Sequence, residues 1–277
     1  MTDLSALLAP GRTRVVGILN VTPDSFSDGG LYDRTETAVA HGLAMVAEGA
    51  DVVDVGGEST RPGALRVSAD VERARVIPVV TALAAEGVAV SVDTMRADVA
   101  LAAVQAGAVM VNDVSGGLAD EGMLATVAGL DVAYVAMHWR AQSDRMQQLA
   151  VYDDVVAEVA AELSHRAEVA LAAGIRPDRL VLDPGLGFSK NADHNWALLR
   201  AVDTFESLGF PVMWGASRKS FLATVGGGLT RQPQERDAAT VALTSILAAA
   251  GVWGVRVHTV AANVEAVAAA ATMRGAS

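Results

Sequence analysis

Short apolar runs alternate with longer amphipathic stretches along the whole chain. The first run, Val15 to Leu19, stops at the polar residue Asn20, and a turn rich in Asp, Ser, Pro and Gly follows. Such short continuous runs are typical of strands buried on both faces of a sheet. The predicted strands are Arg14–Leu19, Val52–Val55, Val88–Val92, Val109–Asn112, Val132–Met137, Leu180–Leu182, Pro211–Trp214 and Gly254–Val257.

Eight amphipathic stretches between and after these runs predict helices. Residues that favour helix starts stand before or at the beginning of four of them: Thr35, Ser68, Asp120 and Asp193. Glycines that favour helix ends follow four of them: Gly49, Gly87, Gly107 and Gly174. The predicted helices are Thr35–Glu48, Ser68–Glu86, Arg96–Ala106, Glu121–Ala128, Asp153–Ala173, His194–Val202, Arg236–Ala250 and Val260–Arg274.

This alternation predicts a parallel sheet covered by helices. Eight strand–helix units in 277 residues indicate an α/β fold with one domain, a closed (β/α)₈ or TIM barrel at residues 14–277, after an N-terminal tail at residues 1–13. An open doubly wound sheet is the alternative, but no Gly-x-Gly-x-x-Gly motif follows the first strand.

A polar or charged residue closes each predicted strand. In a barrel of this kind the carboxyl ends of the strands face the active site, so these side chains should meet at one mouth. They are Asn20, Asp54, Asp93, Asn112 with Asp113, His138 after Met137, Asp183, Ser217 with Lys219, and Arg256 with His258.

The types of these residues indicate two kinds of binding. Carboxylates such as Asp93 and Asp183 suit an amino-pyrimidinone ring, because two acceptor oxygens can face two parallel N–H donors. Arg256 and His258 alternate along one strand and therefore point the same way, which suits an oxyanion or phosphate. Asn20 can supply an oxygen ligand to Mg²⁺, a metal that often shares substrate phosphates.

Ser217 and Lys219 add to this set. Ser217 follows Gly215 and begins a further predicted helix, separate from the eight named above, where its N–H would attract a carboxylate or phosphate. Lys219 adds a positive charge. Ser217 has no Gly-x-Ser-x-Gly setting and the chain has no His-Glu-x-x-His, so hydrolase motifs of these kinds are absent.

Composition narrows the classes of partner. A net charge of −11 and a pI near 4.8 disfavour binding to nucleic acid or to an anionic membrane. The absence of cysteine excludes disulfides and thiol nucleophiles and fits a cytoplasmic location. We expect no membrane span, because no apolar run approaches the required length of about 20 residues. We expect no signal peptide, because the start of the chain, MTDLSALLAPGRTR, has neither a basic n-region nor a long apolar h-region.

Seven motifs in order now resemble one family. GILNVTPDSFSDGG, VDVGGESTRPG, SVDTMR, VNDVSGG, LVLDPGLGF, GASRKSFL and VRVH are similar to those of dihydropteroate synthases. The resemblance implies the (β/α)₈ barrel, Mg²⁺ as cofactor, and a reaction in which 4-aminobenzoate displaces diphosphate from (7,8-dihydropterin-6-yl)methyl diphosphate. Met137-His138-Trp139-Arg140 departs from the more widespread version of its motif and resembles the actinobacterial branch.

The resemblance also implies roles for individual residues. The implied pterin-binding residues are Asp93, Asn112, Met137, Asp183, Gly215 and Lys219. The implied diphosphate-binding residues are Asn20, Thr60, Arg256 and His258, with Asn20 also meeting Mg²⁺. The implied aminobenzoate-binding residues are Phe26, Thr60, Arg61, Pro62, Phe188 and Ser217. The implied catalytic residues are Lys219, Arg256 and His258, with Asp24 and Asp28 stabilising a pterin cation.

The family resemblance further implies that two loops, Thr22–Gly30 and Glu58–Gly63, close over the substrates. It implies inhibition by sulfonamides and a homodimer built on outer helices. Two alternatives stay open: a corrinoid-dependent methyltetrahydrofolate methyltransferase with the same barrel, and a non-catalytic pterin-binding paralogue. Arg256, His258 and the complete ESTRPG motif favour the synthase.

Overall fold

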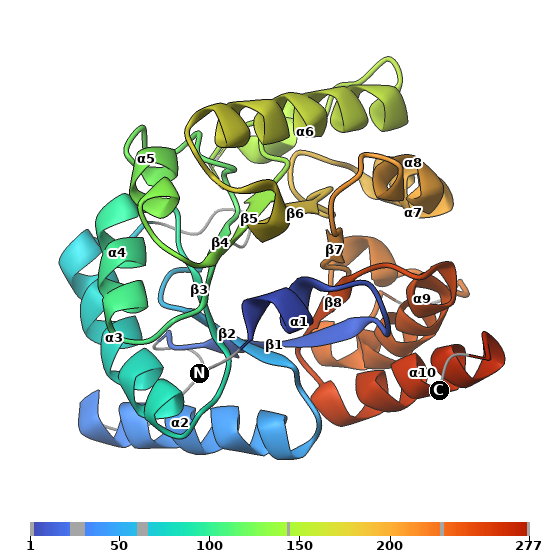
Figure 1. The fold of residues 1–277 in the computed structure, drawn as a ribbon. Coiled ribbons are helices and arrows are strands. Elements are labelled where there is room, and N and C mark those ends of the chain that lie inside the picture. Colours follow the sequence, from blue (N-terminus) through green and yellow to red (C-terminus); the bar gives the residue numbers. More distant parts are fainter. Residues whose placement is uncertain (1–2, 23–30, 60–65, 143–144, 228–229, 276–277) are drawn as a thin grey trace.

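A computed structural model of the chain describes residues 3–22, 31–59, 66–142, 145–227 and 230–275, without the side chains of 31–34. Its eight parallel strands follow one another in the order β6-β5-β4-β3-β2-β1-β8-β7 (Figure 1). The strands are β1 (Arg14–Asn20), β2 (Val52–Gly56), β3 (Val90–Asp93), β4 (Met110–Asp113), β5 (Ala133–Met137), β6 (Leu180–Asp183), β7 (Met213–Trp214) and β8 (Gly254–Val257).

The two ends of the strand order also meet. Leu182 forms a parallel bridge with Val212, and its N–H donates to the carbonyl of Pro211 at 2.9 Å. The sheet therefore curls into a nearly closed barrel, which confirms the predicted (β/α)₈ fold and all eight predicted strands. The alternative of an open doubly wound sheet is wrong.

Helices surround this barrel (Figure 1). The helices are α1 (Leu4–Leu8), α2 (Leu31–Ala47), α3 (Ala69–Ala85), α4 (Ala97–Gln105), α5 (Met123–Ala128), α6 (Val155–Ala172), α7 (Ala192–Arg200), α8 (Val202–Glu206), α9 (Asp237–Ala250) and α10 (Val260–Met273). One-turn 3₁₀ helices lie at Met146–Leu149, Pro177–Arg179, Ser220–Leu222 and Pro233–Arg236. All eight predicted helices are present, whereas α1 and α8 were not predicted. Within the described residues, no helix is long and apolar enough to cross a bilayer.

The helix ends follow the predicted signals in part. Ser68 caps α3 by accepting from the N–H of Val71, as predicted. Thr35 lies inside α2, which begins four residues earlier than the sequence pattern indicates. Asp120 accepts from the N–H of Gly122 at 2.9 Å, directly before α5, as expected for a helix start, and its other oxygen accepts from the N–H of Ala97 at 2.8 Å, at the start of α4. Helix α7 is capped by an asparagine at position 191, and the predicted cap Asp193 lies in its first turn. The predicted terminal glycines all have left-handed φ values, at Gly49, Gly87, Gly107 and Gly174.

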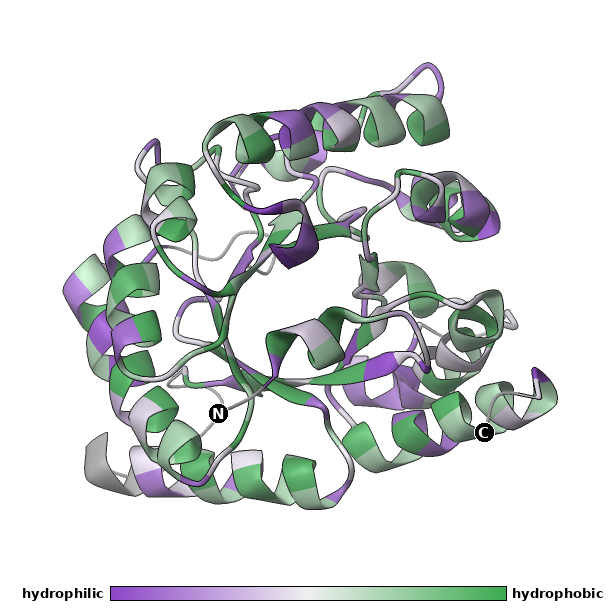
Figure 2. Cartoon of the chain, viewed as in Figure 1, coloured by the Kyte–Doolittle hydropathy of each residue, from purple (hydrophilic) through white to green (hydrophobic). Residues whose placement is uncertain are grey.

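The strands alternate between two apolar clusters. Val15 and Val53 pack outward against the helices, whereas their neighbours Val16 and Val52 fill the inside of the barrel. In Figure 2 the strands are largely coloured as hydrophobic, and hydrophilic colours lie mainly on helices and connecting segments. Both faces of each strand are therefore buried, which explains why the strand sequences show apolar runs instead of an apolar–polar alternation.

Helix α1 closes the amino-terminal end of the barrel, within the predicted N-terminal tail. Asp3 caps it by accepting from the N–H of Ser5 at 2.9 Å. Leu4, Leu7 and Leu8 join the interior cluster. The indole N–H of Trp253 donates to the carbonyl of Leu7 at 3.1 Å and fixes the helix to the sheet.

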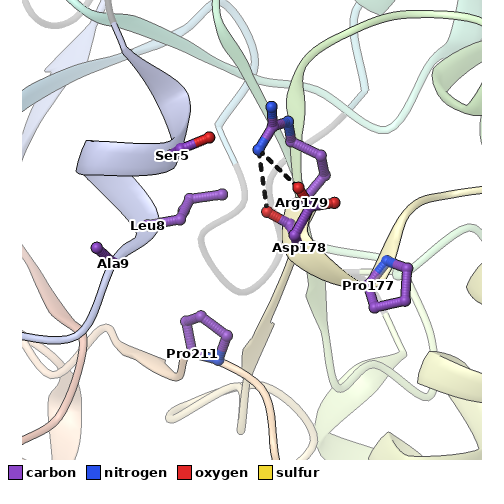
Figure 3. Close-up of a pocket in the computed structure, with 7 residues that line it drawn as sticks. All are labelled: Ser5, Leu8, Ala9, Pro177, Asp178, Arg179 and Pro211. Atoms are coloured by element: carbon purple, nitrogen blue, oxygen red, sulfur yellow. Dashed lines mark hydrogen bonds and ion pairs between the residues drawn. The ribbon is translucent and has the colours of Figure 1, made fainter.

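A small hollow lies between α1 and the 3₁₀ helix that precedes β6 (Figure 3). Its volume is about 190 Å³. Its lining consists of Ser5, Leu8, Ala9, Pro177, Asp178, Arg179 and Pro211. Arg179 lies directly before β6, so the hollow belongs to the barrel end opposite the polar strand ends.

Leu7→Ala should lower the free energy of unfolding by about 2 kcal/mol, because it removes apolar contacts from the closed end of the barrel. Urea denaturation followed by circular dichroism measures this loss. Ser5→Ala on the exposed side of the same helix is the control and should stay within about 0.5 kcal/mol of the wild type. Equal stability of the two variants would contradict a packing role for α1.

Candidate active site

The carboxyl ends of the strands bring a set of buried charges together. Arg256 on β8 donates from Nε to Oδ2 of Asp54 at 2.6 Å and from Nη2 to Oδ2 of Asp93 at 2.7 Å. Asn112 on β4 donates from Nδ2 to the same Asp54 oxygen at 2.9 Å. One guanidinium thus connects β8 with β2 and β3 at the barrel mouth, and β4 joins through the shared oxygen.

Asp54 is the residue whose role sequence reasoning missed. The sequence marks Asp54 as a polar strand end but predicts no binding or catalytic role for it, because its motif gives no sign of its partners. Its side chain is fully buried, and among the described residues its second oxygen, Oδ1, has no hydrogen-bond partner. A lone carboxylate inside the apolar run VVDVG was the available signal, since a buried charge needs a partner.

Asp183 ends β6 on another side of the mouth. Its Oδ1 accepts from the N–H of Gly185 at 2.7 Å. Its Oδ2 lies beside Gly215, where an added Cβ would stand 3.8 Å away. Glycine at this position therefore leaves room beside the carboxylate. Burial raises the pKa of Asp183, although the Gly185 N–H and Lys219 oppose the rise.

Lys219 projects between Asp183 and an aromatic wall. Its Nζ lies 4.2 Å from the centre of the Phe188 ring. Burial lowers the pKa of this ammonium to about 8, helped by the nearby positive charge of Arg256. Phe188 and Met137 belong to one apolar cluster, which also contains Met95. The mouth thus has a charged side and an apolar side.

Ser217 and His258 lie in contact at the ends of β7 and β8. The Ser217 hydroxyl is 2.9 Å from His258 Nδ1 and also accepts from the His258 backbone N–H at 3.1 Å. Burial and the nearby Arg218 and Arg256 lower the pKa of His258 to about 3. At neutral pH this imidazole is therefore uncharged and acts through hydrogen bonds.

The predicted helix start at Ser217 is wrong. Ser217 and Arg218 form a turn, and the nearest helical segment is a single 3₁₀ turn at Ser220–Leu222. Arg218 has a left-handed φ of 58° and donates from Nε and Nη2 to both oxygens of Asp237 at 2.7 Å. This ion pair holds the turn, so Ser217 is positioned by a fixed loop and not by a helix N-terminus.

The remaining predicted residues divide into two groups. Asn20 ends β1 beside Gly56 and is half-buried, as expected for a strand end at the mouth. The other group lies outside the described residues, so its predicted roles stay predictions: Asp24, Phe26, Asp28, Thr60, Arg61 and Pro62.

The stability of the protein should depend on the protonation of Asp93. Burial raises the pKa of Asp93 to about 7, although Arg256 opposes the rise. Between about pH 4 and pH 7 the folded state holds a proton that the unfolded state has lost, so this residue's contribution to stability falls as pH rises. The free energy of unfolding of Asp93→Asn, minus that of the wild type, should therefore increase across this window in urea titrations. A constant or decreasing difference would contradict the raised pKa.

Comparisons with known proteins place this geometry in a family. A profile of the family described as pterin binding enzyme matches residues 16–258. The dihydropteroate synthase of Mycobacterium leprae is 54% identical over 263 residues, which cover 94% of this chain and 92% of the relative. The dihydropteroate synthase of Xanthomonas albilineans, solved with 4-aminobenzoic acid, has a TM-score of 0.88 and 45% identity, over 95% of this chain and 93% of that one.

Two further solved structures are similar. The Xanthomonas albilineans enzyme in complex with 7,8-dihydropteroate has a TM-score of 0.85 and 43% identity, over 95% of this chain and 94% of that one. The Yersinia pestis enzyme with a sulfonamide drug complex has a TM-score of 0.89 and 40% identity, over 99% of this chain and 97% of that one. These relatives are synthases, so the methyltransferase alternative is not favoured. The chain belongs to the dihydropteroate synthases of the pterin binding enzyme family.

Proposed function

We propose that this chain joins 4-aminobenzoate to the methylene carbon of (7,8-dihydropterin-6-yl)methyl diphosphate. The aniline nitrogen forms the new C–N bond and loses a proton, while the C–O bond to diphosphate breaks. The observation that carries the proposal is the set of strand-end residues around Arg256, in a chain 54% identical to a dihydropteroate synthase. Similar structures contain 4-aminobenzoic acid and 7,8-dihydropteroate.

The pterin ring is assigned to Asp93, Asn112 and Asp183, with Met137 and Gly215 beside it. Asp183 suits the amino-pyrimidinone edge, because its carboxylate can accept two parallel N–H bonds. Its Oδ1 is already held by the N–H of Gly185 at 2.7 Å, so the group is oriented before the ring arrives. A ring that lacked the N–H donors would leave this buried carboxylate unpaired, which gives specificity.

Arg256 is assigned to the diphosphate. Asp54 and Asp93 both hold it in this structure. When the pterin takes Asp93, the guanidinium keeps its bond to Asp54 and becomes available to the negative oxygens of the leaving group. Asp54 is thus the fixed support and Asp93 the partner that is exchanged.

Departure of diphosphate can precede the attack, because the dihydropterin delocalises the resulting positive charge. Arg256 stabilises negative charge on the leaving oxygen, and His258 adds a hydrogen bond. The aniline nitrogen is neutral at pH 7 and needs no strong base, so the main work of the protein is positioning and exclusion of water. Stabilisation of the cation by Asp24 or Asp28 stays a prediction.

The 4-aminobenzoate ring is assigned to the apolar side of the mouth. Phe188 offers a ring face, and the neighbouring Lys219 and Ser217 can meet polar groups. Sulfonamides resemble 4-aminobenzoate in shape, and a sulfonamide complex of the Yersinia pestis relative supports competitive inhibition at this place.

Magnesium is proposed as a shared cofactor of Asn20 and the diphosphate. Asn20 supplies a single amide oxygen, a donor set that fits Mg²⁺ only when waters and substrate phosphates complete it. When bound, the ion would neutralise charge on the leaving diphosphate. The role of Asn20 is to orient the diphosphate from β1, the strand next to the one that carries the guanidinium.

A homodimer through α9 and α10 is also proposed. Both helices expose a large apolar side chain, Ile246 at 62% and Met273 at 85%. The two helices pack side by side in Figure 1, so their outer surfaces form one face. A cytoplasmic location, expected from the absence of cysteine, stays a prediction.

Asp183→Asn should weaken the affinity for a pterin by about 10- to 100-fold, because an amide replaces one acceptor oxygen with a donor. The asparagine oxygen can still accept from Gly185, so the loop should stay in place. Isothermal titration calorimetry with a pterin measures the change, and surface-exposed Asp178→Asn is the matched control. Unchanged affinity in a folded Asp183→Asn variant would show that the ring is placed wrongly.

The reaction itself is tested by release of diphosphate. Release should require the dihydropterin diphosphate, 4-aminobenzoate and Mg²⁺ together, and dihydropteroate should form in equal amount. A non-catalytic paralogue would bind the pterin without release. Methyl transfer from methyltetrahydrofolate to a corrinoid, with no diphosphate chemistry, would contradict the synthase assignment.

A further inference from the structure

The chain has only two lysines, Lys190 and Lys219; Lys190 is buried and Lys219 is half-buried. Lys219 belongs to the mouth described above. Lys190 lies behind the turn that carries Phe188, and no role in the reaction has been assigned to it. A buried ammonium is costly unless every N–H is paired, so its contacts show what it holds.

Lys190 Nζ has three acceptors within hydrogen-bond distance. They are Nδ1 of His138 at 2.9 Å, the carbonyl of Gly185 at 3.1 Å and the carbonyl of Phe188 at 3.1 Å. Three acceptors match the three N–H bonds of one ammonium. Two of the three belong to the turn after β6, so this side chain ties the turn to the end of β5.

His138 connects the ammonium to a carboxylate. Its Nε2 lies 3.0 Å from Oε2 of Glu162, and Arg140 donates to the same oxygen at 3.1 Å. Burial and the charge of Lys190 lower the pKa of His138 to about 4. The imidazole is therefore neutral at pH 7, with its proton on Nε2 toward Glu162 and Nδ1 free to accept from Lys190.

The turn that Lys190 holds is strained and closely packed. Ser189 has a left-handed φ of 48°, which is uncommon for a residue with a side chain. Gly187 also has a positive φ, and a Cβ there would stand 2.9 Å from Cδ of Lys219. Such a conformation persists only where the surroundings impose it, and the two carbonyl contacts of Lys190 supply part of that constraint.

The other side of the same turn faces the mouth. Phe188 places its ring 4.2 Å from Nζ of Lys219, while its carbonyl is held from behind by Lys190. The two lysines therefore contact different parts of the same residue, Lys219 its ring and Lys190 its backbone carbonyl. The position of the ring, and with it that of Lys219, depends on the rear contact.

We infer that Lys190 is a positioning residue that holds the Phe188 ring and Lys219 in the geometry required by the aminobenzoate substrate. This inference rests on the proposed function, since it places 4-aminobenzoate against Phe188. Among the pterin contacts, Asp93 and Asn112 stand on strands away from the turn, and Asp183 stands on β6 and meets the turn only through the N–H of Gly185. Loss of Lys190 should therefore affect the aminobenzoate substrate more than the pterin substrate.

Lys190→Met, which keeps the length and removes the charge, tests the role by steady-state kinetics. The KM for 4-aminobenzoate should rise about tenfold or more, because the carbonyls of Gly185 and Phe188 lose their Nζ donor, whereas the KM for the dihydropterin diphosphate should change by less than about threefold. Arg200→Met likewise replaces a cationic side chain by methionine, at an exposed site on α7, and should leave both KM values unchanged.

A second readout does not depend on activity. Because the chain has only two lysines, protein labelled with ¹³C-lysine gives two sets of side-chain NMR signals. The Hε protons of Lys219 should be shifted upfield by the Phe188 ring, and this shift should diminish in Lys190→Met but not in Arg200→Met. If the wild-type protein had no synthase activity, the proposed function would be wrong. The Lys219 signal would still show whether Lys190 holds the Phe188 turn in place.

If Lys190→Met does not fold, Lys190→Gln retains two N–H donors and should give a smaller change in the same direction. A folded variant of either kind with an unchanged Lys219 signal and an unchanged KM for 4-aminobenzoate would overturn the inference. Equal increases in both KM values would also overturn it, because they would indicate a general structural role.

Discussion

The buried guanidinium of Arg256 is the group on which the rest of the site depends. It lies among carboxylates from two other strands, at 2.6 Å from Asp54 and 2.7 Å from Asp93. Removing either side of such a pair leaves an uncompensated buried charge, which costs several kcal/mol. Strands β8, β1, β2 and β3 are consecutive in the sheet. The curvature of the barrel turns their carboxyl ends toward one another, so Arg256 can reach both Asp54 and Asp93.

This arrangement explains how an acidic chain can bind an anionic substrate. The net charge of −11 repels anions at long range, but solvent screens that field within about 8 to 10 Å. Inside the mouth, Arg256 and Lys219 are largely buried and act at short range, where a lower dielectric strengthens each contact. Their carboxylate partners keep them ordered without a ligand, and a substrate replaces one of those partners instead of meeting a bare cation.

Much of the fold could be predicted because each strand is buried on both faces and therefore reads as an apolar run. The strand ends Asn20, Asp93, Asn112 and Asp183 follow from the same pattern, since a polar residue that stops an apolar run marks the mouth. Pairings across the barrel could not be predicted: nothing in VVDVG indicates that Asp54 meets a residue 202 positions later in the chain. The helix expected after Ser217 failed because the Arg218–Asp237 ion pair, a tertiary contact, fixes a turn there. The role of Lys190 could not be predicted because its side-chain partner His138 lies 52 positions earlier in the chain, at the end of another strand.

A crystal structure of the chain with a bound pterin and diphosphate tests the central claim most directly. The account predicts the ring against Asp93, Asn112 and Asp183, and Arg256 bonded to both Asp54 and the diphosphate, with its bond to Asp93 broken. Binding of both ligands with the Arg256–Asp93 pair intact, or binding of the ring away from the strand ends, would contradict it.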